Sequence, residues 1–330
     1  MLEHGGRLQR AVQHYGIARE QWLDLSSGIA PWSFAIPEIP LRAWARLPET
    51  DDGLEQAAAG YYGVEHLLAV AGSQAAIQAL PQLRARGTVG VLSPCYAEHA
   101  EGWRRAGHQV LELRSEQVDE QLDSLDVLVV VNPNNPTGCL HPAAQLLGWH
   151  QRLARRGGWL LVDEAFMDNS PQHSIGAHAQ QAGLIVLRSF GKFFGLAGVR
   201  LGFVLAEPLL LQRLAELLGP WTVSGPTRTL GQTCLLDNAA HQQQIARCAV
   251  ASQRLAALLS RSGFAPTGGC DLFQYLVIDQ AAQVHEFMAQ RGILLRLFSQ
   301  PASLRFGLPA TDADFQRLEQ ALNDYCKETP

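Results

Sequence analysis

The sequence has few charged residues and no closely paired cysteines. Charged residues make up 17% of the 330 positions, below the roughly 25% of an average globular domain, which indicates much buried surface. The 26 Lys and Arg residues are outnumbered by 31 Asp and Glu residues, so we do not expect a nucleic-acid partner, which usually meets a basic face. None of the six cysteines forms a Cys-x-x-Cys pair, which favours reduced thiols in a cytoplasmic protein.

Long apolar runs are also missing. No stretch approaches the roughly 18 residues of a membrane span, and the first residues contain no apolar segment typical of a signal peptide. The sequence contains no Gly-x-Gly-x-x-Gly, P-loop, Gly-x-Ser-x-Gly or His-Glu-x-x-His motif. We therefore expect neither a membrane partner nor a bound metal.

Short apolar runs alternate with helical stretches through the first two thirds of the chain. Several of these runs are continuously apolar, as in strands that are buried on both faces. Such alternation predicts an α/β fold around a mostly parallel sheet. The predicted strands are 67–70, 88–93, 109–113, 126–131, 159–162 and 184–188, and the predicted helices are 73–86, 96–106, 142–156 and 207–218.

The pattern changes after Gly219-Pro220. A long helical region over about 226–262, followed by strands at 272–278 and 304–307, predicts a smaller α+β domain at the C-terminal end. The first forty residues are rich in Gly, Pro and Ser and look like an arm or lid. The expected segments are an arm at 1–40, a large domain at 41–225 and a small domain at 226–330.

Lys192 stands in the densest motif of the chain. The motif begins directly after the predicted strand 184–188, at a strand's carboxyl end, where open α/β folds bind ligands. A lysine amine in a dry pocket can form a Schiff base with an aldehyde. The hydroxyl of Ser189, three residues before it, and the guanidinium of Arg200, eight residues after it, could reach one phosphate. A surface lysine in a glycine-rich turn is the alternative interpretation.

Two further motifs end predicted strands. Asp163, in Val-Asp-Glu-Ala-Phe, could stabilise a protonated pyridine nitrogen, although a capping aspartate would look the same. Asn135 lies in Asn-Pro-Asn-Asn-Pro-Thr-Gly, where the Asn-Pro steps predict a rigid loop. The Asn135 amide could donate to a cofactor's ring oxygen or to a substrate carboxylate, and ordinary turn chemistry is the alternative.

Small residues open a predicted helix after the strand 67–70. Gly72, Ser73 and Gln74 could present free N–H groups and a positive helix dipole to an anion, or could form a simple helix cap. Tyr96 follows another predicted strand and could lie flat against a ring, although a core tyrosine is more usual. Together the motifs supply an aldehyde anchor, a nitrogen partner, a ring-oxygen donor and a phosphate cradle, which pyridoxal phosphate (PLP) requires.

In this order the motifs resemble the class I and II, or fold type I, PLP-dependent aminotransferases over residues 45–307. By that resemblance Lys192 holds the cofactor as a Schiff base and moves protons, and Asp163 pairs with the pyridine nitrogen. Asn135 would lie beside the ring oxygen, and Tyr96 would stack on the ring. The resemblance also implies a homodimer, as in relatives that build the pocket from both subunits. The residues that would hold the phosphate are Gly72, Ser73, Gln74, Ser189 and Arg200.

The opening of the chain resembles the threonine-phosphate decarboxylases of cobalamin biosynthesis, which are similar to histidinol-phosphate aminotransferases. His-Gly-Gly at 4–6, Tyr-Gly at 15–16 and Leu-Asp-Leu-Ser at 23–26 match their "HGG … YG … DFS" pattern. Phe166 stands where many aminotransferases have a tyrosine, and Leu-Pro-Glu at 47–49 replaces their Tyr-Pro-Asp or Tyr-Pro-Glu.

That likeness implies PLP-dependent decarboxylation of O-phospho-L-threonine, a phosphorylated amino acid, to (R)-1-aminopropan-2-yl phosphate and CO2. Amino transfer from histidinol phosphate is the alternative, and a non-catalytic binding module is a hypothesis from another class. Arg305 would clamp the substrate carboxylate, and His4 and Arg296 would grip its phosphate. The substrate-binding residues implied are His4, Gly5, Gly28, Asn135, Arg296 and Arg305.

Overall fold

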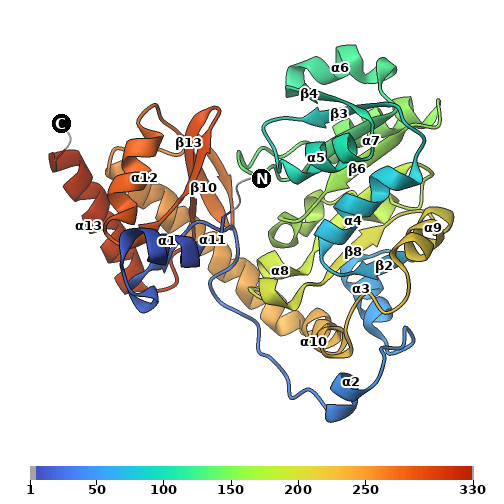
Figure 1. Ribbon diagram of the computed structural model, residues 1–330, viewed down its shortest axis with the longest axis horizontal. Coiled ribbons are helices and arrows are strands. Elements are labelled where there is room, and N and C mark those ends of the chain that lie inside the picture. Colours follow the sequence, from blue (N-terminus) through green and yellow to red (C-terminus); the bar gives the residue numbers. More distant parts are fainter. Residues whose placement is uncertain (1–4, 329–330) are drawn as a thin grey trace. The chain divides into compact units, whose positions relative to one another are not determined.

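The computed structural model describes residues 5–328, which form two compact units (Figure 1). The unit that we call the large unit comprises residues 34–135 and 140–243. The small unit comprises the remaining described residues, 5–33, 136–139 and 244–328. None of the helices within residues 5–328 is both long and apolar enough to cross a membrane.

A seven-stranded sheet forms the centre of the large unit. Its strand order is β2-β8-β7-β6-β5-β3-β4. Strand β8 runs antiparallel to both of its neighbours, and all other neighbouring strands are parallel. The expected mostly parallel sheet is thus confirmed, whereas the antiparallel β8 was not predicted. The strands are β2 (Leu67–Val70), β3 (Thr88–Leu92), β4 (Gln109–Leu113), β5 (Val127–Val131), β6 (Trp159–Asp163), β7 (Leu184–Ser189) and β8 (Gly202–Leu205).

Both faces of this sheet are buried, because successive side chains point to opposite faces and nearly all of them are apolar. Val129, Leu161 and Leu187 belong to a core that also contains apolar side chains from α4 (Ser73–Ala79), α5 (Glu98–Arg105) and α9 (Pro208–Leu218). The intervening residues of the central strands are equally buried. The other helices of this unit are α2 (Leu41–Ala45), α3 (Leu54–Tyr62), α6 (Val118–Gln121), α7 (Ala143–Ala154), α8 (Phe190–Phe193) and α10 (Gly225–Leu236).

The helical region expected at about 226–262 consists of two helices in the structure. Helix α10 ends at Leu236, and α11 (Asn238–Arg261) begins after Asp237, whose ψ of 77° is not helical. The Asp237 carboxylate accepts a hydrogen bond from the Ala240 N–H at 3.0 Å, which is the usual way in which an aspartate starts a new helix.

The compact units also end elsewhere than the expected domain boundary at 225/226. Helix α10 packs on α3 and α2, so it belongs to the large unit, and the division falls inside α11 between 243 and 244. The roles assigned to the three expected segments remain predictions.

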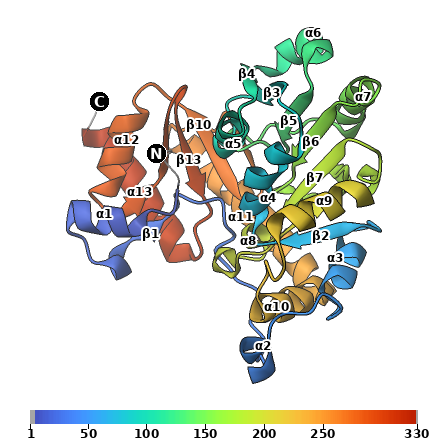
Figure 2. The same cartoon turned by 45° about the vertical axis from the view of Figure 1, so that its right-hand side comes forward.

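An antiparallel sheet of order β12-β13-β10-β9 forms the centre of the small unit. Strands β10 and β13 of this sheet are labelled in Figure 2. Helix α12 packs on β12 and β13, and α13 packs on α12. A short strand near the N-terminal end, β1, pairs in parallel with β11. The expected smaller α+β domain is confirmed in its C-terminal sheet and helices. The elements are α1 (Leu8–Tyr15), β1 (Leu23–Asp24), most of α11, β9 (Gly268–Cys270), β10 (Phe273–Val277), α12 (Ala281–Ala289), β11 (Ile293–Leu294), β12 (Arg296–Ser299), β13 (Ala302–Gly307) and α13 (Asp312–Glu328).

Candidate active site

One edge of the large unit's sheet gathers the ends of many strands. The parallel strands β3, β5, β6 and β7 all end at this edge, and β2 also ends there because two antiparallel pairings separate it from β7. Strand β8 begins at the same edge, where Gly202 pairs with Val70 on one side and Ser189 on the other. All nine predicted cofactor residues end these strands or lie in the turns and short helices next to their ends: Gly72, Ser73, Gln74, Tyr96, Asn135, Asp163, Ser189, Lys192 and Arg200.

The turn after β2 lies against Arg200. Gly72 has a φ of +74°, and a Cβ atom there would lie 2.7 Å from the Arg200 guanidinium. A Cβ atom on Gly202 would lie 2.5 Å from the Ser73 amide nitrogen. Only glycine lets these backbones come so close to each other and to a guanidinium. Backbone N–H groups at a helix start beside an arginine fit an anion such as the phosphate of PLP.

Asp163 is held by two donors at the end of β6. The ring nitrogen Nε2 of His99 lies 2.8 Å from one carboxylate oxygen, and the Ala165 N–H donates to the other at 3.0 Å. Both Asp163 and His99 are buried. The sequence-based prediction included Asp163 but missed His99, although a histidine one helical turn after Tyr96 was a readable signal.

Tyr96 begins a chain of hydrogen bonds through two glutamines. Its hydroxyl donates to the Gln74 side-chain oxygen at 3.0 Å, and the Gln74 and Gln78 amides both donate to Glu98. Burial and the neighbouring carboxylates raise the pKa of Tyr96 to about 12, so its hydroxyl stays protonated at neutral pH. The chain orients the Tyr96 ring at the sheet edge.

Lys192 lies in α8, one turn beyond the end of β7. Its Nζ atom is 5.7 Å from the centre of the Phe166 ring, and Phe166 is buried. An amine next to an apolar wall is in the setting in which lysines form Schiff bases. The structure therefore brings Lys192 to the same edge as Asp163.

Beneath this edge a buried ion-pair cluster joins β6 to β7. The Arg188 guanidinium donates to Glu164 at 2.6 Å and to Asp168 at 2.8 Å, and Glu164 also accepts from the Ile175 N–H at 2.9 Å. Burial raises the pKa of Glu164, while the Arg188 charge opposes that change. Sequence reasoning missed this cluster, which fixes the strand end that carries Asp163.

The loop that carries Asn135 is held at its base by Asn132. The Asn132 N–H donates to the Asp163 carbonyl oxygen at 2.8 Å, while the Asn132 side chain accepts from the His141 N–H and donates to the His141 carbonyl. The Asn134 side chain donates to the carbonyl of Pro94. These bonds explain why the loop follows β5 as a fixed turn, as the sequence predicted.

Two arginines stand directly opposite each other in the small unit's sheet. Arg296 in β12 pairs with Arg305 in β13. Arg305 is buried and donates to the Ser26 carbonyl at 3.0 Å. Burial and the nearby Arg296 charge lower the pKa of Arg305 to about 10. Like charges in register are unfavourable by themselves, so this arrangement fits a site for an anion.

The N-terminal end of the small unit meets Arg305 through Ser26. A Cβ atom on Gly5 would lie 2.3 Å from the Ser26 carbonyl oxygen, and the Gly6 N–H donates to the Ser26 hydroxyl at 2.8 Å. Gly28 is buried two residues further along the chain. His4, which the sequence also predicted, lies outside the described residues.

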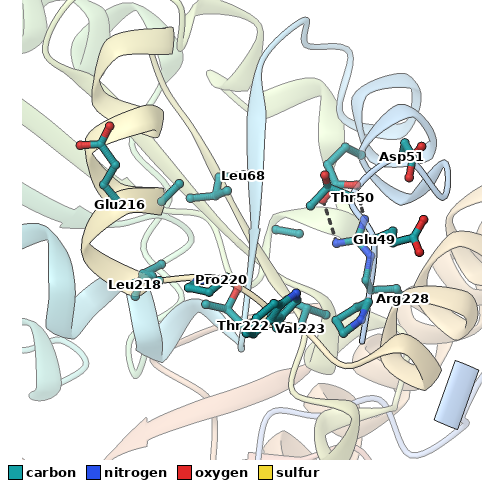
Figure 3. Close-up of a pocket in the computed structure, with 16 residues that line it drawn as sticks. Glu49, Thr50, Asp51, Leu68, Glu216, Leu218, Pro220, Thr222, Val223 and Arg228 are labelled. Atoms are coloured by element: carbon teal, nitrogen blue, oxygen red, sulfur yellow. Dashed lines mark hydrogen bonds and ion pairs between the residues drawn. The ribbon is translucent and has the colours of Figure 1, made fainter. Parts of the chain in front are cut away.

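The pocket in Figure 3 is a different feature of the large unit. It has a volume of about 700 Å³ and is lined by residues of the segments 48–51 and 215–223, by Leu68 and Ala69, and by Glu55 and Arg228. Arg228 donates to Glu55 and to Asp52. The pocket contains none of the predicted cofactor or substrate residues, so it is separate from the site built on the sheet edge.

Comparison with known proteins identifies the family. Residues 39–322 match the family described as aminotransferase class I and II. A threonine-phosphate decarboxylase of Pseudomonas aeruginosa is 62% identical over 322 residues, which cover 98% of this chain and 97% of the relative. A threonine-phosphate decarboxylase of a Sinorhizobium species is 42% identical over 330 residues, 97% of each chain.

A solved structure shows the same fold. The histidinol-phosphate aminotransferase of Sinorhizobium meliloti, in complex with pyridoxal-5'-phosphate, matches with a TM-score of 0.88 and 19% identity, covering 100% of this chain and 96% of that one. The expected aminotransferase fold is confirmed. With a family match over most of its length and relatives identical at 62% and 42% of positions, this chain belongs to the class I and II aminotransferase family, within which it groups with threonine-phosphate decarboxylases.

Proposed function

We propose that the protein binds PLP and decarboxylates O-phospho-L-threonine to (R)-1-aminopropan-2-yl phosphate and CO2. The observation that carries this proposal is the 62% identity to a threonine-phosphate decarboxylase over nearly the whole of both chains. The side chains at the sheet edge and the paired arginines of the small unit are of the types that this reaction requires.

The residues at the sheet edge fit PLP. Lys192 would hold its aldehyde carbon and Asp163 its ring nitrogen, while Asn135 would donate to the ring oxygen and Tyr96 would cover the ring. When bound, PLP withdraws electrons from the substrate's Cα. The close approach of Arg200 to Gly72 places a guanidinium beside the start of α4, where it could pair with the charge of an anion. The phosphate would rest on Gly72, Ser73, Gln74, Ser189 and Arg200.

The protein's own groups would decide which bond of the substrate breaks. Arg305 would bind the carboxylate and Arg296 the remote phosphate, and two such anchors fix the substrate's rotation about Cα. If the carboxylate is aligned for cleavage, CO2 leaves and Lys192 returns a proton to Cα. Because the phosphate provides much of the binding energy that holds this orientation, threonine without phosphate should be a poor substrate.

An assay of gas release tests the proposal. Purified protein with PLP and O-phospho-L-threonine should release CO2 and form an amine that no longer carries a carboxylate. Amino transfer from histidinol phosphate to 2-oxoglutarate, without CO2 from phosphothreonine, would instead support the alternative aminotransferase. If protein that holds PLP catalyses neither reaction, both the decarboxylase and the aminotransferase functions are contradicted.

We further propose that the protein acts as a homodimer. Seven large apolar side chains of the large unit are between 59% and 79% exposed, and five of them lie in two segments of the chain. Exposed apolar side chains that gather on one surface mark a candidate interface, so these five are the ones of interest. They lie on or next to α2 and in the 218–223 segment: Ile36, Leu41, Trp44, Leu47 and Trp221.

The same surface is complementary to itself in charge. Arg42 and Arg46 are exposed on and beside α2, whereas Glu49, Asp51 and Glu216 line the pocket in Figure 3. A two-fold pairing could place each apolar and basic segment against the other copy's acidic pocket.

Light scattering during size-exclusion chromatography tests the dimer. Trp44→Glu should produce monomers. Leu209→Glu, at a similarly exposed leucine of α9, should leave the dimer intact. A wild-type monomer, or a dimer that persists in Trp44→Glu, would refute the assigned surface.

A further inference from the structure

The tip of the loop that carries Asn135 touches the edge strand β9 through backbone atoms. Residues 136–139 belong to the small unit, as β9 does. A Cβ atom on Gly138 would lie 2.1 Å from the Gly269 carbonyl oxygen, and one on Gly268 would lie 2.2 Å from the Thr137 carbonyl oxygen. Real Cβ atoms essentially never approach within 3.0 Å. The two backbones can therefore pack this closely only because these positions lack side chains.

The same part of β9 lies in a row with the two paired arginines. Gly268 pairs with Tyr275 in β10, Tyr275 pairs with Arg305 in β13, and Arg305 pairs with Arg296 in β12. Residues in such a row are joined by the hydrogen-bond ladder of the sheet. A displacement of β12 and β13, the strands that carry the two arginines, is therefore transmitted through the sheet to the contact between β9 and the loop.

The link from the loop tip to Asn135 is short and stiff. Asn135 directly precedes Pro136. Proline fixes its own φ and restricts the residue before it to extended conformations. The base of the loop is closed by the hydrogen bonds between Asn132 and His141. With the base closed and Pro136 rigid, the position of the tip sets the position of the Asn135 backbone.

We propose that Gly138, Gly268 and Gly269 are positioning residues that couple Asn135 to the anion-binding row of Arg296 and Arg305. An anion bound in that row then favours the position in which Asn135 donates to the cofactor's ring oxygen, and this donation in turn favours binding of the anion. The inference rests on the cofactor role proposed above for Asn135, and its test separates the failure of one from the failure of the other.

The first test is a double-mutant cycle read from the visible absorption of the PLP-loaded protein as a function of pH. Asn135→Ala should raise the midpoint by about 1–2 pH units, because a ring oxygen without its donor holds a shared proton more tightly. Gly268→Ala should shift the midpoint in the same direction, since it moves the loop. The variant with both changes should shift it no further than Asn135→Ala alone.

Two matched controls separate the contact from general effects of adding a methyl group. A Cβ atom on Gly148, in α7, meets nothing within 4 Å, so Gly148→Ala should leave the midpoint unchanged. Gly263→Ala is the control for Gly138→Ala. The φ of Gly263, +84°, is close to the +74° of Gly138, but a Cβ atom on Gly263 would meet nothing within 4 Å. Both changes add the same backbone strain, and only Gly138→Ala should shift the midpoint.

The outcomes are distinct. If Asn135→Ala leaves the midpoint unchanged, the cofactor role of Asn135 is wrong. If Asn135→Ala shifts the midpoint but Gly268→Ala and Gly138→Ala behave like their controls, or if the shifts simply add, the positioning role is refuted. Circular dichroism and cofactor content show whether each variant is folded and loaded.

A measurement on the wild-type protein covers the case in which the glycine variants do not fold. Saturating inorganic phosphate is added to the PLP-loaded protein, and amide hydrogen exchange is followed in peptides spanning 133–139 and 266–270. Coupling predicts slower exchange in both segments. Slower exchange in 266–270 alone, or no change in 133–139, overturns the inference.

Discussion

Replacing His99 by leucine tests whether its buried hydrogen bond to Asp163 contributes to catalysis. His99 supplies one of two donors to the Asp163 carboxylate, at 2.8 Å, and the Ala165 N–H supplies the other at 3.0 Å. Leucine has a similar bulk but no donor. The Asp163 carboxylate would then keep only one of these two bonds, in a site from which water is largely excluded.

The magnitude follows from the kind of bond that is lost. A hydrogen bond to a charged group contributes about 1.5–3 kcal/mol. Loss of the His99 bond should therefore weaken the binding of the group that pairs with Asp163 by that amount. If that partner is the ring nitrogen of PLP, kcat/KM should fall by about 10- to 100-fold, because each 1.36 kcal/mol in the barrier is a factor of ten. His99→Asn, which keeps a donor, should recover part of the loss.

The control is a second buried histidine of the same unit. His150 is equally buried and bonds the Ala182 carbonyl at 3.0 Å. The Nδ1 atoms of His150 and His99 have no hydrogen-bond partner among residues 5–328. His150→Leu should lower the melting temperature about as much as His99→Leu while leaving kcat/KM of the folded protein intact. Equal activity in the two variants would refute the reasoning.

Other perturbations have equally definite outcomes. Lys192→Ala should abolish both turnover and the visible absorption of bound PLP, and an active variant would disprove its role. The pKa of Arg305 is lowered to about 10, so this side chain loses its charge as the pH rises through that value. The KM for the phosphorylated substrate should therefore rise about tenfold for each pH unit above 10. A KM that stays constant up to pH 11 would contradict this. Arg188→Leu leaves two buried carboxylates without their cation and should destabilise the fold by about 3–5 kcal/mol in urea unfolding. The exposed Arg254→Leu should change the unfolding free energy by less than about 1 kcal/mol.

Local sequence patterns were sufficient to predict most of the strands and to place the candidate cofactor residues near their ends. A short, valine-rich apolar run such as that at 127–131 favours a strand buried on both faces. Lys192, Asp163 and Asn135 each stand next to such a run, so their placement at one edge followed once the sheet was taken as parallel. The helical region at about 226–262 was predicted without its break at Asp237, because the pattern is helical on both sides of that single capping residue.

What the sequence by itself determined is the order of the elements and the side chains that end them, because these depend on neighbours along the chain. Only the tertiary structure decided which distant residues meet. The antiparallel insertion of β8, the bond of His99 to Asp163 and the register that sets Arg296 opposite Arg305 all join positions that lie apart in sequence. Such pairings arise from the packing of whole strands and helices, and the same local pattern is compatible with many registers.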